Sequence, residues 1–254
     1  GIISSIIKSR KSDAIILTSS KYLNHNIAIK NKTLQKELHE VLQQSIEKKS
    51  SYLVKKKRYS EAAKIKYTAA KHYPNLPRRV KFYYDSSYYL SRIGEWEKAL
   101  QIITETKKIK KGKFEEKLLY LEAKALQHNL KFVRAADLLF KFGKKFPQNS
   151  LSLQSLRLAN LYYSEENLYE KSANVKLLLC QREISKEDKI KFCKESIQDF
   201  TKYKKLDQLE KSLIAMKKST QTAEERIEAN FVYSLSMIQL NKLEKSKSIF
   251  KKIF

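Results

Sequence analysis

Large hydrophobic residues that are predicted to begin a helix recur along most of the chain, and the number of residues between them is nearly constant. Each is aromatic or a leucine, and we call these six residues the repeat anchors: Tyr59, Trp96, Phe132, Tyr169, Leu206 and Leu243. Their separations are 37, 36, 37, 37 and 37 residues. So regular a step indicates an internal repeat, which decides the fold before any local motif does.

Small residues recur at two fixed distances from the repeat anchors. Three positions after the anchor stand Ala62, Ala99, Ala135, Ser172 and Ser246, with Leu209 in the fifth unit. Nine positions before it stand Ser50, Ser87, Ala123, Asn160 beside Ala159, and Ser234, with Ile197 in the fifth unit. Small side chains let helices approach closely, so each unit predicts two antiparallel helices of about 12 to 15 residues joined by a short turn. Pro74 and Pro147, fifteen residues after the first and third anchors, are expected to close their helices.

This pattern resembles the tetratricopeptide repeat, whose period is about 34 residues and whose signature joins an aromatic residue, small packing residues and a terminal proline. The best local matches are YYDSSYYLSRIGEWEKA at 83–99, with Gly94 in the turn, and LRLANLYY at 156–163. The resemblance covers residues 43–254, and the fifth unit, 190–220, keeps only the spacing. It implies an all-α fold, a right-handed α-solenoid of about six helix pairs.

Residues 1–42 precede the clear array and are expected to form extra N-terminal helices. Ile2, Ile3, Ile6 and Ile7 would share one helix face, and Thr33 is expected to cap a further helix. These helices either cap the first repeat or form an arm that binds a partner, a second chain or a membrane surface.

The C-terminal end of the array carries apolar residues at helical spacing, and no polar helix follows them. These residues are Phe250, Ile253 and Phe254, preceded by Ile249. Because solenoids need a terminal cap and exposed apolar patches favour association, we expect either that the array continues or that a partner or a second copy buries this edge.

The composition argues against a sheet and against several classes of enzyme. Glycine and proline number only 4 and 3, too few for the tight turns of a sheet. A Gly-rich phosphate loop and a G-x-S-x-G elbow are excluded because both need closely spaced glycines. The four histidines are isolated and are expected to be surface or turn residues: His25, His39, His72 and His128. We therefore expect no catalytic residue, no metal site and no cofactor.

The chain is strongly basic. Its 53 Lys and Arg against 27 Asp and Glu give a net charge of +26, which favours an anionic partner such as an acidic protein face, a nucleic acid or a lipid surface. The composition, rich in Lys, Ile, Asn and Ser, also resembles that of bacteria with AT-rich genomes, so much of the charge is expected to be solvated surface. Basic runs at 55–58 and 107–111, together with the tyrosines, keep RNA binding as the alternative function.

In tetratricopeptide superhelices the first helix of each pair lines the concave groove in which a partner segment lies. The resemblance places ten residues there: Lys81, Tyr84, Tyr88, Arg92, Lys117, Tyr120, Lys124, His128, Asn160 and Tyr163. Tyrosine gives contact area and lysine gives long-range attraction, so we predict a non-catalytic scaffold that binds an acidic or extended segment of another protein. The alternative is that half of these tyrosines pack between helices. Glu47 stands where a chaperone-tail receptor would need a groove lysine, which disfavours that class.

The compartment is indicated only weakly. Cys180 and Cys193, the only cysteines, are too few for a disulfide framework or a structural zinc site, and a single bridge between them stays open. The turns at 73–77 and 146–150 resemble those of tetratricopeptide proteins of the bacterial envelope, which implies the periplasm or cell envelope, with the cytoplasm as the alternative. The chain begins at Gly1 without methionine, which is compatible with a removed signal or anchor segment.

Membrane spanning is not expected from the sequence. Apolar runs reach about four residues, far short of the roughly 20 that a spanning helix needs. Peripheral association with a membrane and a homodimer formed through a terminal edge stay open beside the predicted hetero-complex.

Overall fold

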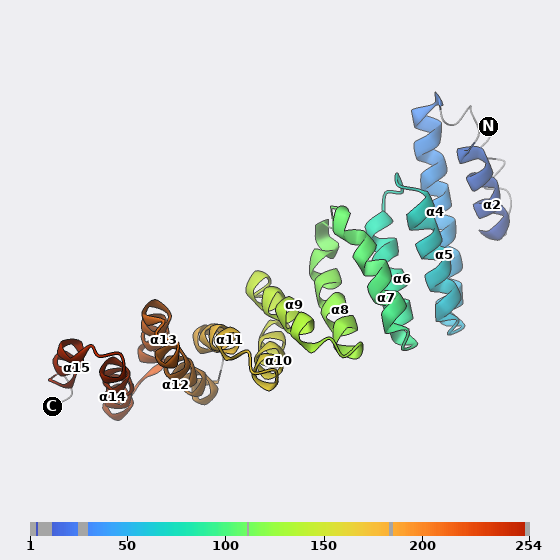
Figure 1. Cartoon of the computed structure of the whole chain (residues 1–254). Helices are drawn as coiled ribbons and strands as arrows, with labels where there is room; N and C mark the ends of the chain where they lie inside the picture. The colour runs from blue at the N-terminus through green and yellow to red at the C-terminus, as the bar shows by residue number, and fades with distance from the viewer. Residues whose placement is uncertain (1–3, 5–11, 25–29, 111, 183–184, 252–254) are drawn as a thin grey trace. The chain divides into compact units, whose positions relative to one another are not determined.

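The computed structural model describes residues 4, 12–24, 30–110, 112–182 and 185–251. Over these residues it contains thirteen α-helices, two short 3₁₀ helices and no strand (Figure 1). The predicted all-α fold is thereby confirmed. The chain divides into two compact units, Gly1–Leu130 and Lys131–Phe254, and each is described by itself.

The first unit is a series of helices that pack on their neighbours in sequence. Its elements are α2 (Ser12–Leu23), α4 (Lys32–Lys55), α5 (Tyr59–His72), α6 (Arg79–Arg92), α7 (Trp96–Glu105) and α8 (Glu115–His128), with 3₁₀ helices at Thr106–Lys108 and Gly112–Phe114. Each α-helix contacts the next, and α6 also contacts α8. Contacts between alternate helices are what stacked helix pairs produce.

The second unit repeats this arrangement. Its elements are α9 (Phe132–Lys145), α10 (Ser152–Glu165), α11 (Tyr169–Arg182), α12 (Lys186–Lys202), α13 (Leu206–Ser219), α14 (Ala223–Gln239) and α15 (Leu243–Phe250). Consecutive helices pack together, α11 also contacts α13, and α12 also contacts α14.

All six repeat anchors open a helix, as the sequence predicts. The anchors are the first residues of α5, α7, α9, α11, α13 and α15. The residue three positions later is buried in every case, including Leu209 of the fifth unit. α5 and α9 end at His72 and Lys145, just before the two predicted closing prolines. The 37-residue step is therefore one tetratricopeptide-like helix pair, and the predicted solenoid-type repeat is confirmed.

One backbone turn joins the two helices of every pair. The residue two positions before each anchor has a positive φ: Lys57 58°, Gly94 79°, Leu130 56°, Asn167 57°, Lys204 55° and Asn241 56°. In the turns of the first, second, fourth, fifth and sixth pairs, the N–H of the next residue donates to a carbonyl five positions back, as in Arg58 to Leu53 at 2.9 Å and Lys242 to Met237 at 2.8 Å. This is the Schellman motif that ends helices. That left-handed conformation costs an ordinary L-residue about 1–2 kcal/mol. Gly94 avoids this cost, and asparagine, at Asn167 and Asn241, tolerates the conformation better than most residues.

The N-terminal region differs from its prediction in two details. α4 is a single 24-residue helix, so the expected division between residues 42 and 43 falls inside it. Asn31 caps this helix, since its side chain accepts a hydrogen bond from the Leu34 N–H at 3.0 Å. The predicted Thr33 cap is wrong because the helix begins earlier, at Lys32. Several predicted positions lie outside the described residues: Ile2, Ile3, Ile6, Ile7, His25, Ile253 and Phe254.

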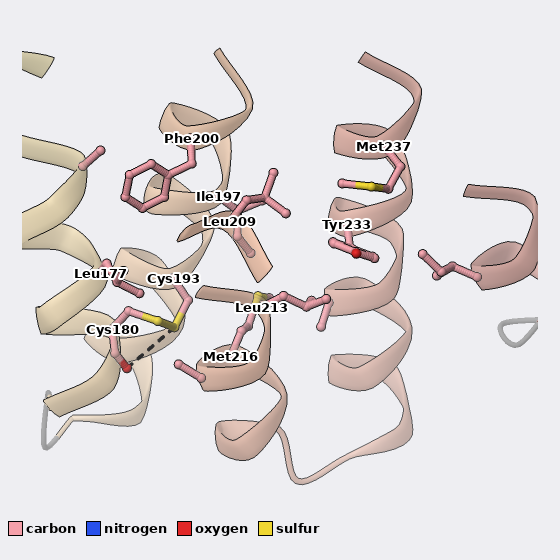
Figure 2. Packing of buried hydrophobic residues seen from close by; sticks show 14 residues of the cluster. Leu177, Cys180, Cys193, Ile197, Phe200, Leu209, Leu213, Met216, Tyr233 and Met237 are labelled. Carbon is pink, nitrogen blue, oxygen red and sulfur yellow. Dashed lines mark hydrogen bonds between the residues drawn. A yellow bond between two sulfur atoms is a disulfide. The ribbon is translucent and has the colours of Figure 1, made fainter. Parts of the chain in front are cut away.

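The core of the second unit is apolar and contains a disulfide. Cys180 of α11 and Cys193 of α12 are bonded, with Cα atoms 4.7 Å apart. Figure 2 shows this bridge beside Leu177, Phe200 and Met216, which belong to the same buried cluster. The bond joins the second helix of the fourth pair to the first helix of the fifth, a link that the sequence left open.

Candidate protein-binding surface

A row of aromatic rings and a lysine lies along α6 and the start of α8. Tyr84 and Tyr88 are one helical turn apart, and their rings stack with centroids 6.1 Å apart and an interplanar angle of 18°. Phe114, just before α8, has its ring 5.8 Å from that of Tyr84. The Nζ of Lys117 lies 5.9 Å from the Tyr84 ring centroid, within the range of a cation–π contact. We call Tyr84, Tyr88, Phe114 and Lys117 the tyrosine–lysine patch.

Part of the tyrosine–lysine patch is open to solvent. Tyr88 is 41% exposed, Lys117 is exposed, and Tyr84 is half-buried. Burial raises the pKa of Tyr84, so its hydroxyl stays protonated and able to donate a hydrogen bond near neutral pH. Arg92, the last residue of α6, is also exposed. Neither Lys117 nor Arg92 has a carboxylate partner within the described part of the chain.

The other residues predicted for the groove in this unit already have partners. Lys81 Nζ lies 2.7 Å from the Asp85 carboxylate. Lys124 donates to the Gln127 side chain at 2.8 Å. The His128 ring stacks on Trp96 of α7 with centroids 3.9 Å apart and planes 6° apart, and Tyr120 is half-buried. Among the cations predicted for the groove in this unit, Lys117 and Arg92 are therefore the ones without a hydrogen-bond or ion-pair partner in the described part of the chain. Lys113, also exposed, adds a cation beside the patch, with its Nζ 6.0 Å from the Phe114 ring centroid.

Asn160 and Tyr163 belong to the second unit and pack between its helices. Tyr163 is 2% exposed, and its hydroxyl donates to Asp137 of α9 at 2.7 Å. Asn160 accepts a hydrogen bond from Ser172 of α11 at 2.8 Å. The packing alternative therefore holds for Tyr163, whose ring does not face solvent. The repeat could have shown this. Tyr163 lies six positions before the anchor Tyr169, and the residue six positions before the anchor Trp96 is Leu90, which is also buried.

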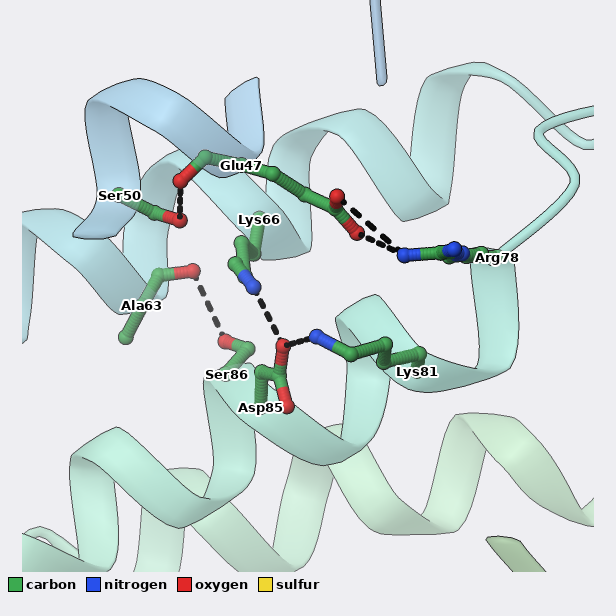
Figure 3. Close-up of polar contacts among 8 residues, drawn as sticks. All are labelled: Glu47, Ser50, Ala63, Lys66, Arg78, Lys81, Asp85 and Ser86. Carbon is green, nitrogen blue, oxygen red and sulfur yellow. Dashed lines mark hydrogen bonds and ion pairs between the residues drawn. The ribbon is translucent and has the colours of Figure 1, made fainter. Parts of the chain in front are cut away.

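Beside α6 lies a buried ion-pair cluster that sequence reasoning missed (Figure 3). Lys66 of α5 has a side chain only 3% exposed and pairs with Asp85, which also binds Lys81. The Lys66 Nζ lies 5.1 Å from the Phe82 ring centroid and 5.7 Å from that of Tyr89. Burial lowers the pKa of Lys66, and the hydrogen bond to Asp85 opposes this effect. The cluster holds α5 against α6 and so fixes the helix that carries Tyr84 and Tyr88.

Of the two other histidines that the structure describes, His39 is buried and His72 is exposed. His39 is only 6% exposed, its Nδ1 lies 2.8 Å from the Gln35 carbonyl, and its ring packs edge-on against Tyr73. The expectation of a surface or turn residue is wrong there, because α2 and α5 cover α4. His72 is exposed, as expected.

Over the described residues, no three His, Cys, Asp or Glu side chains converge on a point that could hold a metal ion. None of the described helices combines the length and the apolar character needed to cross a bilayer.

Comparison with solved structures gives distant matches. The apo form of the quorum sensor NprR from B. thuringiensis is 17% identical over 93% of this chain and 73% of that chain, with a TM-score of 0.42. A Podosopora anserina kinesin light chain protein with nearly identical TPR-like repeats is 11% identical over 70% of this chain and 95% of that chain, with a TM-score of 0.32. No protein-family model and no curated protein sequence matches the chain.

Proposed function

We propose that this chain is a non-catalytic scaffold that binds an acidic, extended segment of another protein on the tyrosine–lysine patch. The observation that carries this proposal is the stacked pair of half-buried Tyr84 and exposed Tyr88 beside Lys117, a cation that no carboxylate of the described chain neutralises. Tyrosine and arginine are enriched at positions that dominate binding energy. A cation without a partner is available to an incoming carboxylate.

The spacing of the rings favours an extended ligand. A strand rises about 3.3 Å per residue, so its residues i and i+2 lie roughly 6.6 Å apart. The two ring centroids are 6.1 Å apart. Alternate side chains of an extended segment therefore match Tyr84 and Tyr88, while the intervening side chains point away and are free to be acidic.

The rest of the chain supports attraction of such a ligand. The net charge of +26 steers acidic partners at low salt, and this steering weakens as salt screens it. The same charge also suits RNA, so nucleic acid is the outcome against which the proposal is tested.

We also propose the bacterial periplasm or cell envelope as the compartment. Support comes from the Cys180–Cys193 disulfide, because such bonds persist in oxidising compartments and are rare in the cytosol. Alkylation of intact source cells before lysis, followed by mass spectrometry, tests this point. Two alkylated cysteines in the unreduced protein would contradict it.

The binding test uses a fluorescein-labelled peptide of alternating Glu and Val residues, with anisotropy as the readout. Tyr88→Ala should weaken binding about tenfold with no change in melting temperature, because Tyr88 is exposed. Tyr52→Ala is the matched control, since Tyr52 on α4 is 57% exposed and lies outside the patch. Equal effects of the two variants would remove the patch from the proposal.

The charge test replaces Lys117 and Arg92 together by Glu. We expect weaker binding and a smaller dependence of affinity on salt. Lys211→Glu with Lys218→Glu on α13, both exposed, is the control for the same change in net charge. Tagged protein captured from source lysate with and without nuclease separates the two functions, since bound material that disappears with nuclease would favour RNA.

A further inference from the structure

Three turns of the first unit place exposed side chains at one edge of the array. The helices of this unit alternate in direction, so α4, α6 and α8 run the same way and end at the same edge, the lower one in Figure 1. The turns that follow these helices expose Lys57, Ile93 and Leu130. We call this edge the turn edge, and it consists of six residues: Tyr52, Lys55, Lys56, Lys57, Ile93 and Leu130.

Leu130 is the least expected residue of the turn edge. Its side chain is 74% exposed, and its backbone is left-handed, with a φ of 56°. Glycine and asparagine adopt that conformation at lower cost, and they occupy the equivalent position at Gly94, Asn167 and Asn241. A single exposed leucine is ordinary on a protein surface, but this one gains neither packing nor a favourable backbone. A contact outside the chain explains why an apolar side chain stands there.

Two more apolar side chains belong to the turn edge. Ile93 directly follows α6 and is 42% exposed. Tyr52, in the last turn of α4, is 57% exposed. In the second unit the turn after α10 instead exposes Glu165 and Glu166, so the apolar tips are not a general feature of turns within the helix pairs.

The turn edge also carries three lysines that are exposed and uncompensated. Lys55 is the last residue of α4, and Lys56 and Lys57 form the turn that follows. None of the three side chains has an ion pair or a hydrogen bond within the described part of the chain. Cations at the end of a helix offset its dipole, but that effect needs only the last turn and does not account for the apolar tips beside them.

The carboxylates nearest to these lysines leave an excess of positive charge. Glu61 pairs with Arg58 at 2.5 Å, and Glu95 pairs with Lys98 at 2.9 Å. Glu97, in the first turn of α7, is exposed and sets one negative charge against three positive ones. The turn edge is therefore both basic and apolar at its tips.

This combination fits the surface of an anionic bilayer better than other anionic partners. Single-stranded nucleic acid stacks its bases on aromatic rings and pairs its phosphates with cations, so it makes no use of Ile93 and Leu130. A protein partner needs a pocket for each protruding side chain, whereas the interfacial region of a bilayer accepts such side chains one by one. Tyrosine is enriched in that region, and each lysine near an anionic lipid surface adds attraction.

We propose that the turn edge docks the first unit on an anionic membrane surface. Ile93 and Leu130 enter the boundary between headgroups and acyl chains, Tyr52 lies at the headgroup level, and the three lysines face lipid phosphates. The contact is peripheral and reversible, because the inserted apolar area is small. This function goes beyond the binding of a protein segment by the tyrosine–lysine patch and does not depend on it.

The charge test measures co-sedimentation with vesicles of phosphatidylethanolamine and phosphatidylglycerol. Wild-type protein should bind these vesicles and should not bind vesicles of phosphatidylcholine alone. Lys56→Glu with Lys57→Glu should weaken binding at least about tenfold. Lys108→Glu with Lys110→Glu is the matched control, because both residues are exposed and lie in the connection between α7 and α8, at the opposite edge. Equal losses in the two variants would overturn the assignment to the turn edge.

The apolar test replaces the side chain at one tip. Leu130→Asn should weaken binding to the anionic vesicles about fivefold. The melting temperature should stay the same or rise, because asparagine suits a left-handed backbone. Leu17→Asn is the matched control, since Leu17 in the middle of α2 is 72% exposed and lies away from the turns. Unchanged vesicle binding by Leu130→Asn would overturn the insertion of this tip.

The remaining arms separate the membrane from other partners. Fluorescein-labelled oligouridine that binds wild type, is released by the Lys56 and Lys57 substitutions and is unaffected by Leu130→Asn would assign the turn edge to nucleic acid. Tyr88→Ala should weaken the Glu–Val peptide and leave vesicle binding unchanged, and Leu130→Asn should do the reverse. Absence of binding to the anionic vesicles, with the peptide still bound, would overturn the membrane proposal alone.

Discussion

Each of the two compact units has an ion pair between consecutive helices at the same repeat positions, but the two ion pairs differ in burial. In each, a lysine seven residues after an anchor reaches a carboxylate eleven residues before the next anchor. In the first unit Lys66 pairs with Asp85, and both side chains are largely buried, at 3% and 13% exposure. In the second unit Lys176 lies 3.4 Å from Glu195 and 2.9 Å from Asp199, and its side chain is 15% exposed. The repeat determines where each lysine and its carboxylate lie, and the side chains packed around them determine how deeply the ion pair is buried.

The second unit adds a covalent link where its ion pair is more open. The Cys180–Cys193 bridge joins α11 to α12, the same two helices that Lys176 connects. The junction between α5 and α6 instead encloses its lysine beside Phe82 and Tyr89. A repeat thus fixes where two helices meet, while the side chains at that point decide how much the junction contributes to stability.

The largest expected effect is removal of the carboxylate of the buried pair. Asp85→Asn leaves the Lys66 ammonium buried without a counter-charge and should cost about 3–5 kcal/mol. Glu195→Gln should cost under about 1 kcal/mol, because that pair is more exposed and Lys176 keeps Asp199. Urea unfolding followed by the fluorescence of Trp96, the one tryptophan, reports the first unit, and far-UV circular dichroism reports the whole chain. Equal costs would mean that burial does not separate the two pairs.

The second effect concerns the disulfide. Replacing Cys180 and Cys193 by Ala should cost about 3 kcal/mol, since the bond closes a short loop in the unfolded chain. The loss should fall on residues 169–219 in native-state hydrogen exchange, with the Trp96 transition unchanged. Wild-type protein treated with reductant is the matched control and should show the same regional loss. A shift of the Trp96 transition by the same amount would contradict the assignment to the second unit.

Sequence reasoning found the repeat because its cues are local. An aromatic residue or leucine opens each second helix, and a small residue one turn later is buried. It missed Lys66 because a lone lysine is normally assigned to the surface. The repeat held the missing signal, since the residues seven positions after the other anchors are Ile103, Leu139, Lys176, Leu213 and Phe250. A lysine in that column predicts a buried cation that needs a carboxylate on the next helix.

The turns show where the sequence carries no cue. The left-handed position is occupied by glycine or asparagine at Gly94, Asn167 and Asn241, which accept that conformation, but by Lys57, Leu130 and Lys204 in the other pairs. Those three residues adopt it because packing of the flanking helices determines the chain direction. The exposure of Tyr88 and the burial of Tyr163 likewise depend on which helix faces the neighbouring helices leave open. Which side chains are buried follows from the stacking of the helix pairs, so it cannot be predicted from one sequence position taken alone.

A smaller effect comes from exchanging residues at that turn. Gly94→Ala should destabilise by about 1 kcal/mol through the backbone alone, because an added Cβ would meet no atom within 4 Å. Lys204→Gly should stabilise by a similar amount, about 1 kcal/mol, by relieving the strain of a φ of 55°. Both can be measured as shifts in the urea midpoint. Destabilisation by Lys204→Gly would mean that the added entropy of the unfolded chain outweighs the relieved strain.

The smallest expected effect concerns a third ion pair between helices, between Lys186 and Glu225, which is more exposed than the other two. Lys186 of α12 lies 2.6 Å from Glu225 of α14, and this contact together with backbone N–H groups lowers the pKa of Glu225 from 4.5 to about 2. A carboxyl whose pKa is lower in the folded state stabilises the fold above pH 4.5 and loses that contribution as the pH falls towards 2. Glu225→Gln should therefore flatten the decline of stability over that interval, and added salt should shrink the difference from wild type. Glu225 also closes the capping box with Thr222, and Gln at this position can keep that hydrogen bond. If the variant loses as much stability as wild type between pH 4.5 and 2, the ion pair with Lys186 does not hold α12 against α14.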